Sequence, residues 1–225
     1  MDTLIDVLLW WPVFVFSCTF HEAAHAWTAK RGGDMTAYEG GQVTLDPLPH
    51  IRRAPFGMVL VPLLTIAFGG FMIGWASTPY DPHWAQRYPH RSAWMSLAGP
   101  LANLVLVILA FILIKVGLSA GFFQNGTEPQ ITKWLISPDS NILNTVASLL
   151  AVLFSLNIIL LILNLIPVPP LDGAEAILLL FPESSAPAIR EKMGYVGIFG
   201  IFIAWVILSK IAGPVLGIFW WLALA

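Results

Sequence analysis

The sequence predicts an all-α polytopic membrane protein with about four full spans, a re-entrant segment and a short strand or hairpin. Of its 225 residues, 57% are hydrophobic and only 11% are charged, whereas a soluble domain carries about 25% charged residues. A chain so poor in charge cannot cover itself with a polar surface, so lipid must be its solvent. We expect residues 1–225 to form a single membrane-embedded domain.

Four apolar segments are expected to cross the membrane as helices. They cover residues 4–30, 92–118, 142–166 and 194–224. The first has no basic start, because its first charges are Asp2 and Asp6, and it lacks a small-residue cleavage pattern, so we interpret it as a retained helix. The last is interrupted by Lys210, Gly213 and Pro214, so one kinked span and two short pieces both fit.

Residues 55–75 are also apolar, but Gly57, Pro62, Gly69 and Gly70 make them a poor straight helix. If this segment enters and returns on one side, most loop cations share that side, as the positive-inside rule requires. Those cations are Lys30, Arg31, Arg52, Arg53, Arg87, Arg91, Arg190 and Lys192, with only Lys133 opposite. The sequence therefore predicts a re-entrant segment and an outer N-terminus.

A short strand or hairpin is expected between the first span and the re-entrant segment. Residues 42–45 alternate polar and apolar side chains, and they lie between the chain breakers Gly41 and Pro47. Such a strand could pair with an extended polypeptide by strand addition.

The strongest chemical signal is the pattern formed by His21, Glu22 and His25 in the first span. Residues four apart lie on one helix face, so the two imidazoles can bind one Zn²⁺, and the glutamate between them can act as a general base. Ionisable groups in a membrane helix are costly and usually functional. The alternative is that hydrogen bonds to neighbouring helices satisfy all three groups structurally.

A catalytic zinc ion needs a third protein ligand and an open fourth position. Asp34, Glu39 and Asp46 are candidates, but each lies in a polar, turn-rich segment where a solvated loop explains it equally well. Asp172 follows a membrane span and the proline-rich break at residues 167–170. A broken helix at membrane depth is tolerated only where it lines a protein cavity, which favours Asp172 as a ligand.

Three motifs occur in order along the chain: His21-Glu22-x-x-His25, Gly99-Pro100-Leu101-Ala102-Asn103 and Asn164-x-x-Pro167-x-Pro169-x-Leu171-Asp172-Gly173. Together they span most of the sequence and resemble the site-2 protease family of intramembrane zinc metalloproteases. The chain resembles a compact form of that family, without a PDZ insertion or a nucleotide-sensing domain.

The resemblance implies roles for individual residues. His21, His25 and Asp172 would bind Zn²⁺, and Glu22 would activate water. Asn164 would position or polarise the scissile peptide.

Four other polar residues are candidates with weaker signals. The resemblance implies that Asn103 belongs to a small-residue packing motif beside the site. Glu175 lies one turn beyond Asp172, where it either supports the site or faces water. Cys18 is interpreted as a packing residue, and Asn157 as an interhelical hydrogen-bonding residue.

We therefore predict an intramembrane metalloendopeptidase that hydrolyses transmembrane or membrane-anchored proteins in a prokaryotic cell membrane, with its active site toward the cytoplasmic side. Nucleic acid is excluded as a partner, because the net charge is -2 and the basic residues lie in loops. The alternatives are a non-proteolytic zinc-binding protein or transporter, and a metallohydrolase acting on lipid. Glu22 discriminates between the first alternative and a protease, because a transporter needs the ligands but no general base.

Overall fold

The computed structural model describes the whole chain except residues 1–2, 70–71, 127–129 and 139. In that part of the chain, four helices are long and apolar enough to cross a membrane. They are α1 (Thr3–Gly32), α6 (Pro89–Ser119), α7 (Asn141–Leu165) and α10 (Gly200–Leu224). The predicted all-α polytopic fold is confirmed, and the four expected spans lie where the apolar segments placed them.

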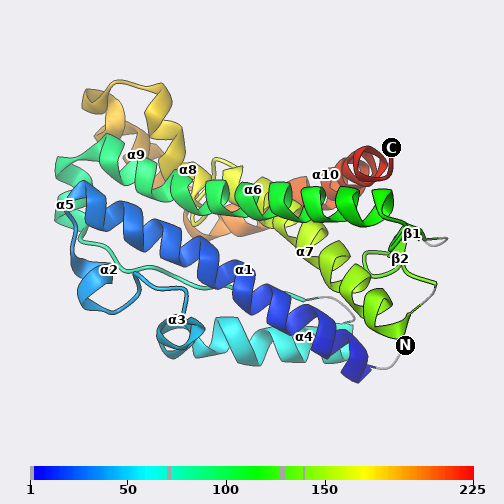
Figure 1. Cartoon of the computed structure of the whole chain (residues 1–225). Helices are drawn as coiled ribbons and strands as arrows, with labels where there is room; N and C mark the ends of the chain where they lie inside the picture. Colours follow the sequence, from blue (N-terminus) through cyan, green and yellow to red (C-terminus); the bar gives the residue numbers. More distant parts are fainter. Residues whose placement is uncertain (1–2, 70–71, 127–129, 139) are drawn as a thin grey trace.

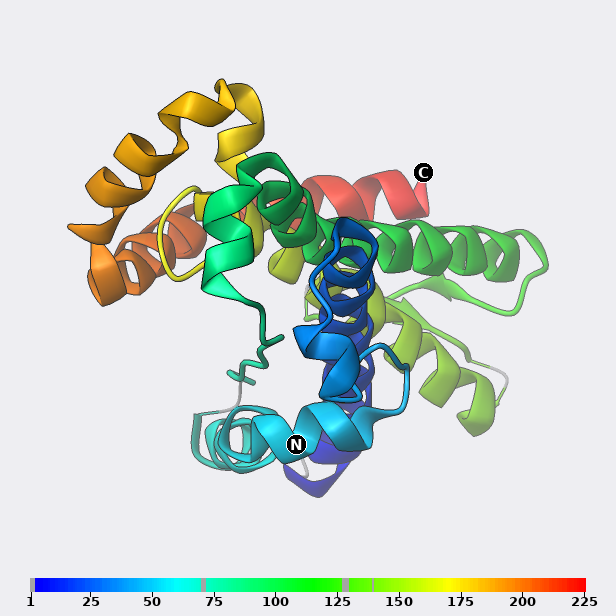
Figure 2. The same cartoon turned by 90° about the vertical axis from the view of Figure 1, so that its left-hand side faces the viewer.

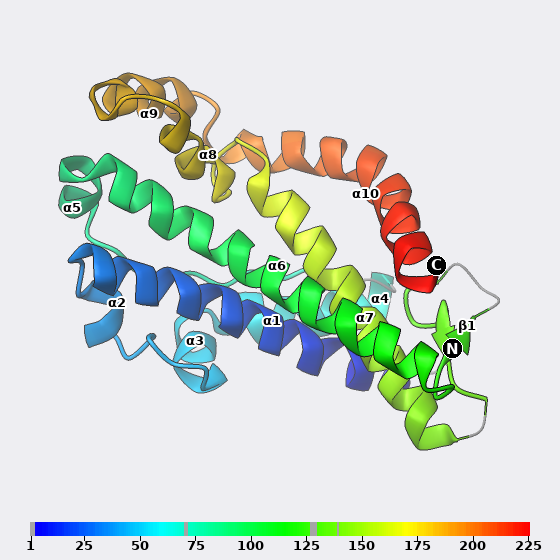
Figure 3. The same cartoon turned by 45° about the horizontal axis from the view of Figure 1, so that its top comes forward.

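Local sequence explains where these helices begin and end. α1 ends before Gly33, whose φ of 99° is a conformation that glycine adopts at little cost. Ser140 caps the start of α7 by accepting a hydrogen bond from the Leu143 amide, and no helix continues through Pro167. α10 is one helix that includes Pro214, so the last apolar segment is a single span, and Figure 3 shows it curving along its length.

The helices α1, α6 and α7 pack side by side and form the centre of the molecule (Figure 1). α1 and α7 run in one direction and α6 runs in the other. One apolar cluster joins α6, α7 and α10 to the short antiparallel pair β1 (Gln124–Asn125) and β2 (Leu135–Ile136), and a second joins α1 to α7.

The re-entrant segment leaves one end of the bundle and comes back to it. After α3 (Pro47–Arg53) the chain turns by 109° into a π-helical turn (Phe56–Leu60) and α4 (Val61–Gly69). Residues 72–81 then return in extended form beside α1, with Gly74 against Phe14 and the Thr78 hydroxyl bonded to Glu22. α6 therefore starts at the end where α1 stops, which is the path predicted for residues 55–75.

The strand expected at residues 42–45 is wrong, because these residues form bends and the turn into α3. The Gln42 amide bonds to the Ala37 carbonyl of α2 (Thr36–Glu39), and Asp46 caps α3 through the Leu48 amide. Hydrogen bonds of local turns and caps thus compete with the pairing that a strand would need. An alternation of only four residues is too short to distinguish a strand from such a turn.

The remaining short elements lie on two flanks of the bundle. Figure 2 shows α3 and α4 on one flank and α8 (Gly173–Ala176) and α9 (Ala186–Gly194) on the other, with α1 and α6 between them. α5 (Pro82–Arg87) precedes α6, and 3₁₀ turns at Ile177–Leu180, Glu183–Ser185 and Gly197–Phe199 link α8, α9 and α10. α2, α5 and α9 lie near the end where α1 stops, whereas α4 lies beside the first half of α1 (Figure 1).

Candidate metal centre

Two histidines on one face of α1 form the base of the site. His21 and His25 are four residues apart, and their Nε2 atoms lie 2.9 Å from each other. Only 7% of His21 and 6% of His25 is exposed, so both imidazoles are shielded from lipid and water by neighbouring helices. This is the geometry that the helical spacing predicts.

Asp172 reaches the histidines from the loop that follows α7. Its Oδ2 lies 3.1 Å from Nε2 of His21 and 3.4 Å from Nε2 of His25. The loop turns back tightly on the end of α7, since a Cβ at Gly173 would lie 2.5 Å from the Ile166 carbonyl oxygen. The structure thus brings together residues that are about 150 positions apart in sequence.

The donor set fits a metal ion such as zinc. Each imidazole directs its Nδ1 away from Asp172, with Nδ1 of His21 2.7 Å from Oδ1 of Asn103 and Nδ1 of His25 2.6 Å from the Met95 carbonyl. Oδ2 of Asp172 is buried and has no hydrogen-bond partner among the described residues. Nε2 of His21, Nε2 of His25 and Oδ2 of Asp172 therefore converge on one point, which is the arrangement a zinc ion requires.

Gly99 of α6 leaves the space in front of these ligands. A Cβ at this position would lie 2.4 Å from Nε2 of His25 and 2.5 Å from Nε2 of His21. Any other residue would therefore collide with the ligand atoms. A second donor set also exists, because ligand atoms of His21, Glu22 and His25 all lie within 4.8 Å of one another.

Glu22 is held in place by the returning segment. The Thr78 hydroxyl lies 2.7 Å from Oε2 of Glu22 and 3.0 Å from the Glu22 backbone carbonyl. Glu22 is 6% exposed and borders the same cavity as His25 and Asp172. A carboxylate fixed beside two imidazoles can accept a proton from a reacting group in that cavity.

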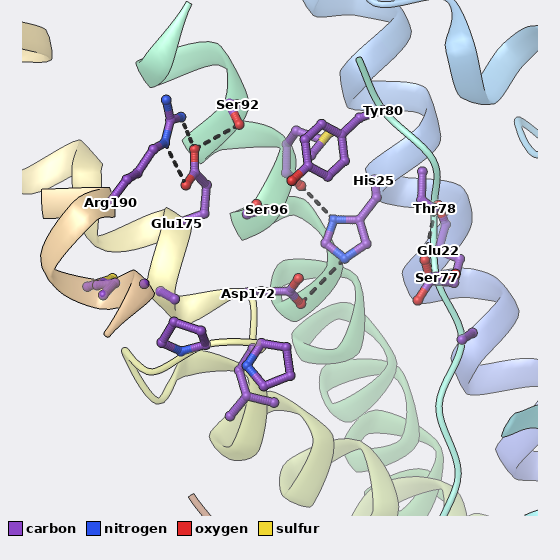
Figure 4. A pocket seen from close by; sticks show the side chains of 18 residues that line it. Glu22, His25, Ser77, Thr78, Tyr80, Ser92, Ser96, Asp172, Glu175 and Arg190 are labelled. Carbon is purple, nitrogen blue, oxygen red and sulfur yellow. Dashed lines mark hydrogen bonds and ion pairs between the residues drawn. The ribbon is translucent and has the colours of Figure 1, made fainter. Parts of the chain in front are cut away.

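The cavity has a volume of about 410 Å³ and is open on one side. Figure 4 shows Glu22 and His25 on one side of it, Glu175 and Arg190 on the other, and Asp172 between them with its carboxylate directed toward His25. Glu175 accepts hydrogen bonds from Oγ of Ser92, at 2.9 Å, and from Arg190. Glu175 is thus part of the cavity wall, paired with α9, and does not orient a histidine.

The other candidates occupy different positions. Asn103 is fully buried and contacts His21 directly, so it does more than pack. Asn164 is half-buried in the last turn of α7; within the described chain its side chain has no hydrogen bond and does not border the cavity. Cys18 packs in the apolar cluster between α1 and α7.

Sequence reasoning missed Thr78, the Met95 carbonyl and Arg190. Thr78 contacts a residue 56 positions away, and Met95 a residue 70 positions away. A threonine in a loop and a carbonyl in an apolar helix carry no local signal of such contacts. Only Arg190, a cation near the third motif, could have been suspected.

Comparisons with known proteins agree with this geometry. Residues 11–208 match peptidase family M50. The chain is 32% identical over 195 residues to "Putative zinc metalloprotease YwhC" of Bacillus subtilis, covering 84% of this chain and 74% of the relative.

Two mycobacterial relatives match at the same level. "Putative zinc metalloprotease Rip2" of Mycobacterium tuberculosis is 32% identical, over 97% of this chain and 73% of the relative. Its counterpart in Mycolicibacterium smegmatis is 32% identical over 73% of this chain and 54% of the relative, so the match covers about half of that protein. A comparison with solved structures finds no match.

Proposed function

The chain belongs to peptidase family M50, and from this premise we propose that it is an intramembrane zinc metalloprotease that cleaves membrane-anchored polypeptides. The observation that carries the proposal is that Asp172 meets His21 and His25 beside one cavity, which Glu22, His25 and Asp172 line. The relatives' names support zinc as the cofactor. A lipid bilayer is its proposed solvent, because four helices are long and apolar enough to cross one.

His21, His25 and Asp172 are proposed to hold the zinc ion through Nε2, Nε2 and a carboxylate oxygen. When bound, zinc polarises a carbonyl and makes water more acidic. Gly99 keeps the space in front of the ligands free for the scissile peptide, because it has no side chain there. Two neutral ligands and one anion leave a net positive centre that attracts a carbonyl oxygen.

Glu22 is proposed as the general base and, later, the general acid. It would take a proton from the attacking water and pass it to the leaving amine. The Thr78 hydroxyl donates to Oε2 of Glu22, which leaves Oε1 for the proton. This contact fixes the direction in which the carboxylate points without neutralising it.

The substrate must reach the site in extended form, because the amides of a helix are hydrogen-bonded and shielded. Residues 72–81 are extended beside the cavity, and the amides of Ala76, Ser77 and Thr78 have no hydrogen-bond partner in the described chain. We propose that an unwound substrate pairs with this segment by strand addition. Residues 72–81 thus take the substrate-pairing role first expected for residues 42–45. The Gln42 side chain supports this segment by donating to the Ser77 carbonyl at 3.3 Å.

Asn164 is proposed to contact the scissile peptide only when substrate is bound, since its side chain has no partner in the described chain. If it donates to a developing oxyanion, Asn164→Ala lowers kcat by roughly 10²- to 10³-fold with zinc content unchanged. Single-turnover cleavage and metal analysis measure both quantities. A kcat within about threefold of wild type, below that range, would make Asn164 structural.

The orientation is also a proposal, with the N-terminus outside and the site toward the cytoplasm. The cation-rich ends of α1, α5 and α9 share one end of the bundle, and β1 and β2 lie at the other, which supports the positive-inside assignment. Gln86→Cys and Gln124→Cys are both exposed test positions. An impermeant thiol reagent on intact cells should label only position 124, and labelling at 86 would reverse the orientation.

The test of the function is cleavage of single-span substrates by purified protein. Wild type should cleave, Glu22→Gln should retain about one zinc per chain and not cleave, and the exposed control Glu39→Gln should behave as wild type. Full cleavage by Glu22→Gln would refute the general base. If wild type instead moves zinc across liposome membranes without cleaving any substrate, the transporter alternative is correct.

A further inference from the structure

A line of fully buried polar side chains runs away from the metal centre between α1, α6 and α7. Asn103 contacts His21, Asn157 contacts Asn103, and Ser17 contacts Asn157. All three have 0% exposure. Buried amides are costly unless their donors and acceptors are matched, so the direction of every hydrogen bond in this line is constrained.

The direction of these hydrogen bonds is fixed at the end of the line that is farthest from the metal centre. The Leu153 backbone carbonyl can only accept, and it lies 2.8 Å from Nδ2 of Asn157. The other proton of Nδ2 goes to Oγ of Ser17 at 2.9 Å. The Asn157 amide therefore has its nitrogen toward Leu153 and Ser17, and its oxygen toward Asn103.

The next amide must follow this orientation. Oδ1 of Asn157 can only accept, so Asn103 presents Nδ2 to it at 2.8 Å. This leaves Oδ1 of Asn103 facing Nδ1 of His21 at 2.7 Å. Because Oδ1 can only accept, the Nδ1 of His21 must carry a proton, and in the neutral imidazole Nε2 then has the lone pair that a metal would use.

The second histidine reaches the same state by a shorter route. Nδ1 of His25 lies 2.6 Å from the Met95 carbonyl, which belongs to the backbone and cannot be reversed. An asparagine amide can be reversed by rotation through about 180°, exchanging donor and acceptor. His21 therefore needs something to prevent reversal of Asn103, and Asn157 is the residue that contacts the other end of that amide.

We propose that Asn157 is a positioning residue that sets the tautomer of His21 through Asn103. It acts from α7 on a ligand in α1, with the Leu153 carbonyl as its fixed reference. The inference deepens the proposed function, because it concerns the same metal centre. It assigns Asn157 a role that simple interhelical packing would not require.

Two substitutions of similar size separate the two roles. Asn157→Leu removes both the donor and the acceptor, so Asn103 is free to reverse and His21 populates the tautomer with the proton on Nε2. Asn157→Asp loses the donor to Leu153 but keeps an oxygen toward Asn103, so the Nδ1 proton of His21 is retained. A packing role predicts the opposite order, because a leucine suits an apolar helix interface better than a buried carboxyl.

Nitrogen NMR of labelled histidine in the metal-free protein reads the tautomer directly. Wild type and Asn157→Asp should show His21 protonated on Nδ1, and Asn157→Leu should show a mixture of tautomers. His25 should be unchanged in all three proteins. Ser17→Ala is the matched control, because it removes a side branch of the line and leaves Leu153 and Asn103 in contact with Asn157.

Zinc affinity, measured by competition with a chelator, should follow the same order. Asn157→Leu should weaken binding by roughly tenfold, the lower end of the range for groups that orient metal-ligating histidines. Ser17→Ala and Asn157→Asp should stay within about threefold of wild type, below that range. Equal losses in Asn157→Asp and Asn157→Leu, or an unchanged His21 tautomer in Asn157→Leu, would overturn the proposal.

Neither readout needs proteolysis, so the two proposals fail separately. If purified wild type cleaves no substrate, the spectrum of His21 still decides the role of Asn157. If Asn157→Leu does not fold, Asn157→Asp still tests the role of Asn157. Absence of the Nδ1 proton of His21 in that variant would refute the proposal.

Discussion

The α1–α6–α7 core and the C-terminal layer formed by α8, α9 and α10 face the same cavity but are built differently. Half of the apolar window of α1 and of α7 is buried in the protein, against 17% for α10. The core contributes Glu22 and His25 to the lining of the cavity, and the layer contributes Glu175, Arg190 and Met193. The core residues of the site are thus held by packing within the protein, whereas most of α10 faces outward.

Asp172 lies where the two regions join. It follows the last turn of α7 and precedes α8, and its carboxylate reaches back to the core histidines. This division indicates that changes in the core affect the metal, and that changes in the layer affect access to it.

The largest effect is expected for Gly99→Ala in the core. The new methyl group would lie within 2.5 Å of both Nε2 atoms, so the histidines or α6 must move. We expect zinc affinity to fall by more than about 100-fold, beyond the usual effect of disturbing groups that orient ligands, and cleavage to be lost. Metal analysis and the cleavage assay measure this.

The control is Gly213→Ala in α10, where a Cβ would meet nothing within 4 Å. It should leave zinc and cleavage unchanged and stabilise the helix by about 0.5–1 kcal/mol. If both alanine variants keep full zinc, the close approach of α6 to the ligands is not required for the site.

The comparison also explains what could be predicted from sequence. The two histidines and Asp172 could be proposed because a helical spacing and a proline break at membrane depth are local signals. The return of residues 55–75 followed from the distribution of lysine and arginine. Residues 42–45 were misjudged, because the capping of α3 by Asp46 competes with strand formation.

Contacts across the core had no such signal. Gly99 faces the histidines because of how α6 packs on α1, and Thr78 reaches Glu22 because the re-entrant segment runs beside α1. A sequence gives spacing within one helix but not the rotation of one helix against another. The third motif placed Asp172 near a candidate site, and the structure brings its carboxylate to the histidines, but the motif gave no sign that Glu175 pairs with Arg190 in the layer.

A smaller effect is expected for Thr78→Val, which removes the hydroxyl that orients Glu22 and keeps the shape of the side chain. Since the hydrogen bond to a carboxylate is worth about 1.5–3 kcal/mol, kcat should fall by roughly 10- to 100-fold while zinc content stays constant. Single-turnover kinetics separate this from weaker substrate binding. Thr145→Val is the matched control, because its hydroxyl bonds only to its own helix at the far end of α7. A fall in kcat of equal size in both variants would assign the effect to general destabilisation.

The smallest effect is expected in the layer, for Arg190→Met. Arg190 joins α9 to Glu175 of α8 and to the Ala85 carbonyl of α5, at 3.1 Å. The pair is partly exposed, with 24% of each side chain accessible, so its contribution is about 1 kcal/mol or less. Methionine keeps the apolar stem and loses these bonds, so the cavity wall should loosen without disturbing the histidines.

We expect KM to rise by about two- to fivefold, the equivalent of up to 1 kcal/mol, with kcat and zinc content unchanged. High salt should raise the KM of wild type toward that of the variant, because salt screens accessible ion pairs. Lys192→Met, an exposed position on the same helix, should change nothing. Loss of zinc in Arg190→Met would contradict the separation of core and layer, since it would mean that the wall also holds Asp172 against the histidines.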